Sequence, residues 1–314
     1  MVVALLCMSG AAQAADDEAA LRNRFLKGVA ETAAEVMPLA HHAKYSIEDE
    51  YPIGDRASTV EEFQCSLQGQ FAKATGKKQG VEIETDTVKN DKYAFAVTRS
   101  PGVERYTLAW LAPSGGATPE EERQIQYTVD SARAVLLGNW HLYGKFVWEW
   151  VKTPHSNLKS FREERTDDGS FVRVEFDYLP TGTKGRLTDG FMVLDPSSHW
   201  SLREYGITLS NGAKSHSFVH LQSGSDGFPA PHRIITTFSS PGDDSHVAFK
   251  RTVTIERLAQ DDLDEDEFYL THYGLPEPNF ERGGVWVWLK YLIAGALCLA
   301  ISFGVRWWRG RAAG

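Results

Sequence analysis

Cysteine is scarce in this sequence, and its scarcity limits how the folded part can be stabilised. Three cysteines occur in 314 residues, namely Cys7, Cys65 and Cys298. Cys7 and Cys298 lie in apolar segments near the two ends, so Cys65 has no partner for a disulfide within the polar middle of the chain. That middle must therefore be stabilised by its hydrophobic core. Cys65 alternates with Phe63 and Leu67, which predicts a buried and unreactive thiol.

Catalytic and metal-binding motifs are also lacking. The sequence has no Gly-x-Ser-x-Gly turn, no His-Glu-x-x-His pair and no Cys-x-x-Cys pair. The segment ATGKKQG, residues 74–80, lacks the Ser or Thr of a phosphate-binding loop and is typical of a hairpin turn. The acidic segment DDLDEDEF, residues 261–268, lacks the glycine and the final glutamate of a calcium loop. We therefore expect a protein that is not an enzyme and that has no cofactor and no bound metal.

The charge balance disfavours nucleic acid as a partner. The chain carries 33 Lys and Arg against 42 Asp and Glu, a net charge of −9. Residues 284–314 contain four basic side chains and no acidic one, so the remainder is more acidic than the whole. An acidic surface repels phosphate groups, and we expect neither nucleic acid nor anionic lipid head groups to bind through charge.

The C-terminal segment has the features of a membrane span. From Val285 to Val305 the only ionised side chain is Lys290. About 20 residues of helix are needed to cross the hydrocarbon core of a bilayer. Tryptophans at both ends of the segment are typical of the two membrane interfaces, and the arginines that follow place the C-terminus in the cytoplasm. These residues are Trp286, Trp288, Trp307, Trp308, Arg306, Arg309 and Arg311.

The N-terminus has the features of a secretory signal. An apolar run is followed by Ala12-Gln13-Ala14, a small-x-small cleavage site, and then by acidic residues. The two ends together predict a signal peptide at 1–14, an extracytoplasmic domain at 15–280, a transmembrane helix with its flanks at 281–306 and a cytoplasmic tail at 307–314. We therefore expect a single-pass protein of the cytoplasmic membrane, with its large domain outside the cytoplasm.

Two long segments and one short segment have helical periodicity. Residues 18–37 place an apolar side chain at every third or fourth position and are followed by Pro38, which predicts an amphipathic helix. A Thr-x-x-Glu capping box with proline at the first helical position, residues 118–121, predicts a second helix that ends near Gly138. A shorter helix is expected at 146–151. The residues after the first helix, which include YPIGDR, are interpreted as a polar linker.

The rest of the domain alternates as β-strands do. Residues 62–71 and 81–112 alternate apolar and polar side chains between turn signals. From Ser170 to Leu258 the alternation continues, interrupted by the hairpin signals DPSS, SNG and SPGD. Strands joined by such short turns form an antiparallel meander, and their single apolar face predicts that helices cover one side. The predicted fold class is therefore α+β.

The order of these elements resembles that of the lipoprotein-sorting carriers and the related anti-sigma-factor regulators, a LolA/RseB-like group. The resemblance implies a strongly curved antiparallel sheet, an unclosed half-barrel, with helices on its concave side. It also implies a lipid or lipoprotein as partner. Two strings, GFMVLDPSSHWSLREY at 190–205 and FYLTHYGLPEP at 268–278, resemble uncharacterised single-pass membrane proteins of planctomycete-type bacteria. The carriers are soluble or lipid-anchored, whereas this chain is expected to carry its own membrane helix.

Large aromatic side chains supply the candidate binding residues. The stretch from Trp140 to Trp150 is rich in them, and it either covers an apolar cavity or fills the space between the helices and a wide curved sheet. The segment LDPSSHW, residues 194–200, is either a ligand loop or a packed turn. The candidate cavity residues are Trp110, Trp140, Phe146, Trp148, Trp150, Phe176 and Trp200.

Two functions of different classes fit these features. The first is a membrane-anchored extracytoplasmic binding module for a lipid, an acyl chain or a lipoprotein. The alternative is an envelope sensor or regulator that binds a protein partner and has no small-molecule ligand. An apolar cavity of a size typical for small-molecule sites favours the first function. A flat, exposed apolar patch without a cavity favours the second.

Overall fold

A computed structural model describes most of the chain, and its residues divide into two compact units, residues 1–269 and 270–314. In the second unit the short helix η3 (Leu270–Tyr273) is followed by a turn in which the Leu275 N–H donates to the Leu270 carbonyl at 3.1 Å. All that follows concerns the first unit. The structure describes residues 2–52, 58–69, 71–77, 83–113, 118–180, 185–224, 227–257 and 264–280.

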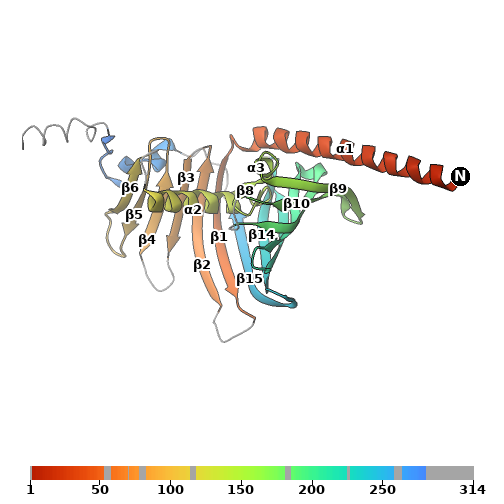
Figure 1. Cartoon of the computed structure of the whole chain (residues 1–314). Helices are drawn as coiled ribbons and strands as arrows, with labels where there is room; N and C mark the ends of the chain where they lie inside the picture. Colours follow the sequence, from red (N-terminus) through yellow and green to blue (C-terminus); the bar gives the residue numbers. More distant parts are fainter. Residues whose placement is uncertain are drawn as a thin grey trace, which may run out of the picture. The chain divides into compact units, whose positions relative to one another are not determined.

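One antiparallel sheet of 13 strands dominates the described part of the first unit (Figure 1). One meander comprises β1 (Ala40–Glu50), β2 (Thr59–Gln68), β3 (Phe71–Lys77), β4 (Glu84–Lys89), β5 (Tyr93–Arg99) and β6 (Thr107–Pro113). The other comprises β9 (Ser156–Thr166), β10 (Gly169–Tyr178), β11 (Leu187–Asp195), β12 (Ser201–Leu209), β13 (Lys214–Ser223), β14 (Pro229–Ser240) and β15 (Asp243–Arg257). The last strand, β15, pairs with the first, β1, and so joins the two meanders into one curved sheet.

The helices and a small hairpin lie on one face of this sheet, which we call the inner face. Helix α2 (Pro119–Leu136) crosses strands β1 to β4, and helix α1 (Val2–Val36) packs beside β9 and α3 (Figure 1). The remaining elements are the hairpin of β7 (His141–Leu142) and β8 (Lys145–Phe146), the one-turn helix α3 (Val147–Trp150), and the turns η1 (Pro196–Ser198) and η2 (Glu265–Phe268).

Strand alternation decides which side chains enter the core. On β10, Val174 and Phe176 are 0 and 1 % exposed on the inner face, whereas Arg173 and Glu175 point to the outer face. On β2, Cys65 points inward and is 1 % exposed, and burial raises the pKa of its thiol. The prediction of a buried cysteine is therefore confirmed, as is the prediction of a curved antiparallel sheet covered by helices.

Helix α1 is held against the sheet by the segment predicted as a ligand loop or a packed turn. The ring of Trp200 packs on Phe25 with ring centroids 5.6 Å apart. Gly28 faces the same indole, and a Cβ there would lie 1.7 Å from the Trp200 Nε1. The His199 carbonyl accepts hydrogen bonds from Thr32 of the helix at 3.2 Å and from the Trp140 indole at 2.8 Å. In the structure this segment is a packed turn.

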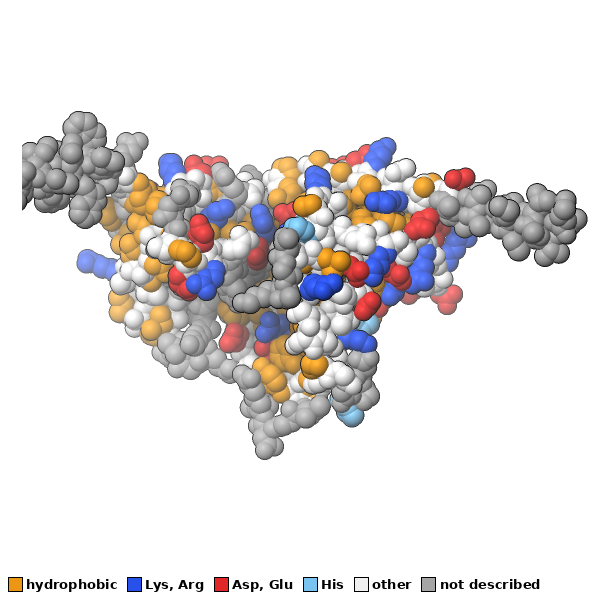
Figure 2. Space-filling model, in the orientation of Figure 1, with side chains coloured by type: hydrophobic (Ala, Val, Ile, Leu, Met, Phe, Trp, Pro, Cys, Tyr) orange, Lys and Arg blue, Asp and Glu red, His pale blue; other side chains and the backbone are white. Residues whose placement is uncertain are grey.

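The two outermost strands of the sheet differ in how far their edges are protected from pairing with strands of other molecules. At β9, the Phe161 N–H donates to the Glu18 carboxylate of α1 at 3.0 Å, and Arg24 pairs with Glu163 at 2.8 Å. At β6, the Leu108 side chain is 39 % exposed. Figure 2 shows charged side chains of both signs around α1 and β9, and hydrophobic side chains gathered near β5 and β6. Charged and covered edges are a common protection against strand pairing between molecules.

Several predicted elements are confirmed. Helix α2 begins at Pro119 as the capping box predicts, and it buries Val129, Ala132 and Leu136, which are 6, 0 and 3 % exposed. Helix α1 buries Phe25 and Val29 as predicted, although it begins at Val2 instead of residue 18.

Other predicted boundaries are wrong. The expected linker after the first helix contains strand β1, whose histidines and acids had hidden its alternation. The expected strand 62–71 breaks at Gly69, whose φ of +57° turns the chain from β2 into β3. Strand β3 then runs through Gly76 to Lys77, where a turn was expected. The expected helix 146–151 is a hairpin strand followed by the single turn of α3.

No helix in the part of the chain that the structure describes has a stretch long and apolar enough to cross a membrane. The span predicted at 281–306 lies outside the described residues, as does the tail at 307–314.

Candidate functional site

Small side chains form the inner face of the sheet beneath α2. The inner positions of β3 are Ala72, Ala74 and Gly76. The strand register places Cys65 opposite Ala74, and Ala74 opposite Thr87 on β4. The inner positions of β5 and β6 continue this floor with Ala94, Ala96 and Ala112. Such short side chains leave space between the sheet and the elements that cross it.

A cavity of about 680 Å³ lies between this floor, the C-terminal end of α2, the β7–β8 hairpin and strands β1, β12, β14 and β15. A volume of this size is typical of small-molecule sites. Most of its wall is apolar. Aromatic rings are contributed by Tyr45, Phe63, Tyr143 and Tyr205, and aliphatic side chains by Ile47, Val135, Ile234 and Val253.

The cavity is closed at one end and open at the other. At the closed end His141 and Tyr205 are 6 and 8 % exposed. At the open end the Arg251 side chain is 45 % exposed. Strand β1 contributes Tyr45 and Ile47 to the lining, two inner positions that lie about 7 Å apart along the strand.

The hairpin that closes the inner end has an unusual backbone. Its two turn residues, Tyr143 and Gly144, have φ of +48° and +80°, the conformation of a type I′ turn. Tyrosine is rarely found with positive φ, so the conformation of Tyr143 is strained. It places the phenol against Tyr205, with ring centroids 5.5 Å apart, and burial raises the pKa of Tyr143. The hairpin thus fixes an aromatic, uncharged end wall.

His141 adds a polar but neutral group to this wall. Burial and the nearby Arg133 guanidinium lower the pKa of His141 from 6.5 to about 4. The imidazole is therefore neutral at neutral pH. Its ring packs edge-on against Phe146, with centroids 5.3 Å apart. No charge is thus presented to a ligand by His141.

Charged side chains appear only towards the open end of the cavity, among the residues described as lining it. The Arg251 guanidinium pairs in a bidentate manner with the Asp49 carboxylate, with both N–O distances at 2.8 Å. Glu61 lies one inner row further in, opposite Ile47. The site therefore combines an apolar, neutral interior with a charged rim.

The seven residues predicted to line a cavity are placed elsewhere on the inner face. None of them is among the described residues that line the cavity. Trp150 packs on Phe176 at 5.4 Å and donates its indole N–H to the Leu142 carbonyl at 2.9 Å. Phe146 and Trp148 stack on each other at 4.6 Å. These four residues are brought together, and they fill the space over the second meander.

The other three predicted residues are separate from that group. Trp140 donates to the His199 carbonyl of the turn that holds α1, and Trp200 belongs to that turn and packs on Phe25 of the helix. Trp110 is half-buried on β6, opposite Ala96 at the far end of the small-residue floor. A binding role for these residues stays a prediction.

Sequence reasoning missed the lining residues other than Tyr143, which belongs to the aromatic stretch from Trp140 to Trp150, although a signal for the floor was present. Ala72, Ala74 and Gly76 alternate along one strand, and Ala94 and Ala96 do so along another. Alternate small residues in neighbouring strands indicate an inner face that large side chains do not fill. The contribution of His141 had no comparable signal, because a two-residue hairpin after a helix positions it.

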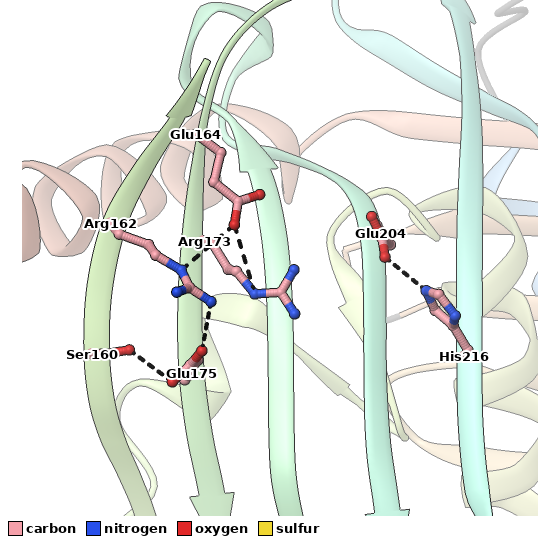
Figure 3. A network of polar contacts seen from close by, with 7 residues as sticks. All are labelled: Ser160, Arg162, Glu164, Arg173, Glu175, Glu204 and His216. Atoms are coloured by element: carbon pink, nitrogen blue, oxygen red, sulfur yellow. Dashed lines mark hydrogen bonds and ion pairs between the residues drawn. The ribbon is translucent and has the colours of Figure 1, made fainter. Parts of the chain in front are cut away.

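The outer face of the second meander is exposed to solvent and carries ion pairs. Arg162 of β9 binds Glu175 of β10 at 2.8 Å, and the same carboxylate accepts from Ser160 at 3.0 Å (Figure 3). Further along, His216 of β13 lies 2.7 Å from Glu204 of β12. Exposed pairs of this kind contribute little to stability individually. Among the described residues, no three His, Cys, Asp or Glu side chains gather closely enough to hold a metal ion.

Comparison with known proteins gives matches in structure alone. No known protein family and no curated protein matches the sequence. The chain is similar to the structure of a LolA superfamily protein from Nitrosomonas europaea, with a TM-score of 0.45 and 14 % identity over 78 % of this chain and 98 % of that one. It is also similar to a DUF1329 family protein from Desulfovibrio piger, with a TM-score of 0.45 and 7 % identity over 81 % and 98 % of the two chains.

One of these two similar structures is a LolA superfamily protein, the group named from the order of the elements in the sequence. The resemblance to single-pass proteins of planctomycete-type bacteria stays a prediction.

Proposed function

We propose that the protein is a binding module that holds the apolar part of a lipid or lipoprotein, such as an acyl chain, in the cavity beneath α2. The observation that carries this proposal is the cavity itself, about 680 Å³ in volume and lined mostly by apolar side chains. Burying apolar surface contributes about 25 cal/mol per Å², from which the costs of association are subtracted. A long apolar chain is a ligand that can bind through the burial of its apolar surface area alone.

The distribution of charge in the cavity supports a ligand with an apolar end. The charged lining residues lie only towards the end marked by Arg251, whose side chain is 45 % exposed. The closed end is formed by groups that are neutral, His141 and Tyr143. Burying a charged group against such a wall would be costly, so the apolar end of the ligand enters first.

The proposal extends to where the protein works. The apolar segment 285–305 with its flanking tryptophans and arginines supports a membrane anchor, and the N-terminal 14 residues support export. In this arrangement the domain works next to the outer face of the cytoplasmic membrane, where it exchanges its ligand with lipids or lipoproteins.

The alternative, a regulator that recognises a protein partner without a ligand, has less support. A flat apolar patch would favour it. Hydrophobic side chains gather near β5 and β6 (Figure 2), where Val103 and Leu108 are 49 and 39 % exposed. Other exposed large hydrophobic side chains lie on separate elements, such as Val60 on β2, Phe218 on β13 and Val247 on β15. Single exposed hydrophobic residues are normal on protein surfaces.

Native mass spectrometry of the purified full chain tests the proposed function. We expect an acyl-bearing molecule to remain bound, one per chain, after exchange into a second detergent, because the cavity encloses it. Lipid held only around the membrane segment would be lost in that exchange. A chain that carries no such molecule, and that binds no added acyl probe, would contradict the proposal.

A further inference from the structure

Glu61 is the one acidic side chain among the described cavity-lining residues, and its surroundings are aliphatic. It lies on the inner face of β2 opposite Ile47, and the same row continues through Val253 to Ile234. All four residues line the cavity. Glu61 is half-buried, and its carboxylate forms no ion pair with another described residue. An aliphatic residue at this position would complete the apolar wall, so the carboxylate calls for an explanation.

The other charges of the open end cancel. Arg251 and Asp49 neutralise each other through their bidentate pair. The neighbouring lining residues Thr85 and Thr236 carry hydroxyl groups without charge. Glu61 therefore leaves one excess negative charge at the end where the head group of an amphiphile would stay. That charge repels a carboxylate or a phosphate and attracts a cation.

Aromatic rings lie one row further in. Phe63 follows Glu61 on the same face of β2, about 7 Å along the strand. Its ring stacks on Tyr45 with centroids 5.1 Å apart and planes at 19°. Both rings line the cavity. An aromatic face beside a carboxylate is a favourable setting for an ammonium group, which interacts with the ring quadrupole as well as with the charge.

We infer that Glu61 selects amphiphiles with a positively charged amine or quaternary ammonium head group, held at the open end while the apolar chain fills the cavity. This inference rests on the proposed function, since it assumes that the cavity takes an apolar chain. It goes further than the proposed function because it names the type of head group and the residue that recognises it. A positively charged amine occurs in two kinds of molecule. In a lipid it is attached to an apolar chain, whereas a small free amine has no such chain.

The test uses probes with the same chain and different heads. Decyltrimethylammonium, decanol and decyl sulfate are titrated calorimetrically into the full chain in nanodiscs, with empty nanodiscs as the blank. We expect the cation to bind about fivefold more tightly than decanol, the upper range for a partly exposed charge pair. Decyl sulfate should bind more weakly than decanol. Tetramethylammonium, which lacks the chain, distinguishes a site for free amines, and we expect it not to bind.

Matched variants assign the effect to Glu61. Glu61→Gln keeps the shape of the side chain and should remove the preference for the cation over decanol. Glu61→Lys should reverse the order in favour of decyl sulfate. Glu62→Gln is the control, because Glu62 is the exposed neighbour on the opposite face of the same strand.

The outcomes separate this inference from the proposed function. If decanol binds but the wild-type chain prefers no head group, or if Glu61→Gln keeps the preference, the inference is wrong and the binding function stands. Tight binding of tetramethylammonium would likewise overturn it. If none of the decyl probes binds, the proposed function itself fails.

Discussion

The two halves of the sheet use their inner faces differently. In the second meander the inner positions carry large side chains, and Val174, Phe176, Met192 and Leu194 are at most 1 % exposed. In the first meander the corresponding positions on β3 carry Ala72, Ala74 and Gly76. In the second half, β9 to β11 are filled by their own residues together with α1 and α3. The first half leaves a cavity under the end of α2, which β12, β14 and β15 of the second half also border.

The difference shows that side-chain volume, rather than backbone curvature, decides where this sheet leaves space. Both halves belong to one continuous antiparallel sheet with a helix on the inner face. Protein interiors are packed about as densely as organic crystals, so a face of small residues leaves either a void or room for a ligand. The predictions below test whether the two halves respond differently to changes in volume and charge.

The largest effect is expected from removing a ring in the filled half. Trp150 is 2 % exposed, contacts Phe176 and Tyr178 with centroids 5.4 and 4.9 Å away, and donates to the Leu142 carbonyl. Trp150→Ala should lower the free energy of unfolding by about 3–5 kcal/mol. Urea denaturation followed by circular dichroism measures it. A loss below about 1 kcal/mol would contradict the view that this half is the densely filled one.

A pH effect is expected from the cavity half. The pKa of His141 is lowered from 6.5 to about 4 in the folded state. Between these values the unfolded chain binds a proton that the folded chain does not, so stability present above pH 6.5 is lost as the pH falls. The loss amounts to at most about 1.4 kcal/mol per pH unit. His141→Gln should flatten the dependence of unfolding free energy on pH in this window.

His220→Gln is the matched control, because His220 is exposed on β13. It should keep the pH dependence of the wild-type chain. Equal slopes for the wild-type chain and His141→Gln would show that His141 is not buried in its neutral form.

Adding one methyl group separates the halves directly. A Cβ at Gly190 would lie 2.8 Å from the ring of Phe176, and a Cβ at Gly76 would lie 2.8 Å from the ring of Phe63. Phe176 is enclosed, so Gly190→Ala should cost about 1–3 kcal/mol. Phe63 borders the cavity and has room to move, so Gly76→Ala should cost less. Thermal unfolding of both variants makes the comparison, and equal losses would argue against a cavity beside Phe63.

The sequence was sufficient for the fold class and for the elements with strong periodicity. Helix α2 was predicted from its capping box, and the second meander from alternation between turn signals. Strand β1 was missed because His41, His42 and the acids from Glu48 to Glu50 obscure the alternation. It pairs with β2 on one side and on the other with β15, which lies some 200 residues away in the sequence.

The candidate site could be predicted less well, for a physical reason. Large aromatics such as Trp148 and Trp150 attract attention in a sequence, yet large side chains fill space instead of leaving it. The cavity arises where Ala74 and Gly76 lie beneath a helix. Small residues also occur in tightly packed contacts, so they do not by themselves indicate a cavity. Only the register of neighbouring strands shows that the small residues coincide.

The binding of decanol to an Ala74→Leu variant tests the central claim most directly. Ala74 faces the cavity from its floor, so the added atoms occupy ligand space instead of compressing the core. We expect the free energy of unfolding to change by less than about 1 kcal/mol. The affinity for decanol should fall at least about tenfold, which corresponds to about 1.4 kcal/mol. Unchanged affinity in a folded Ala74→Leu chain would show that the cavity beneath α2 is not the binding site.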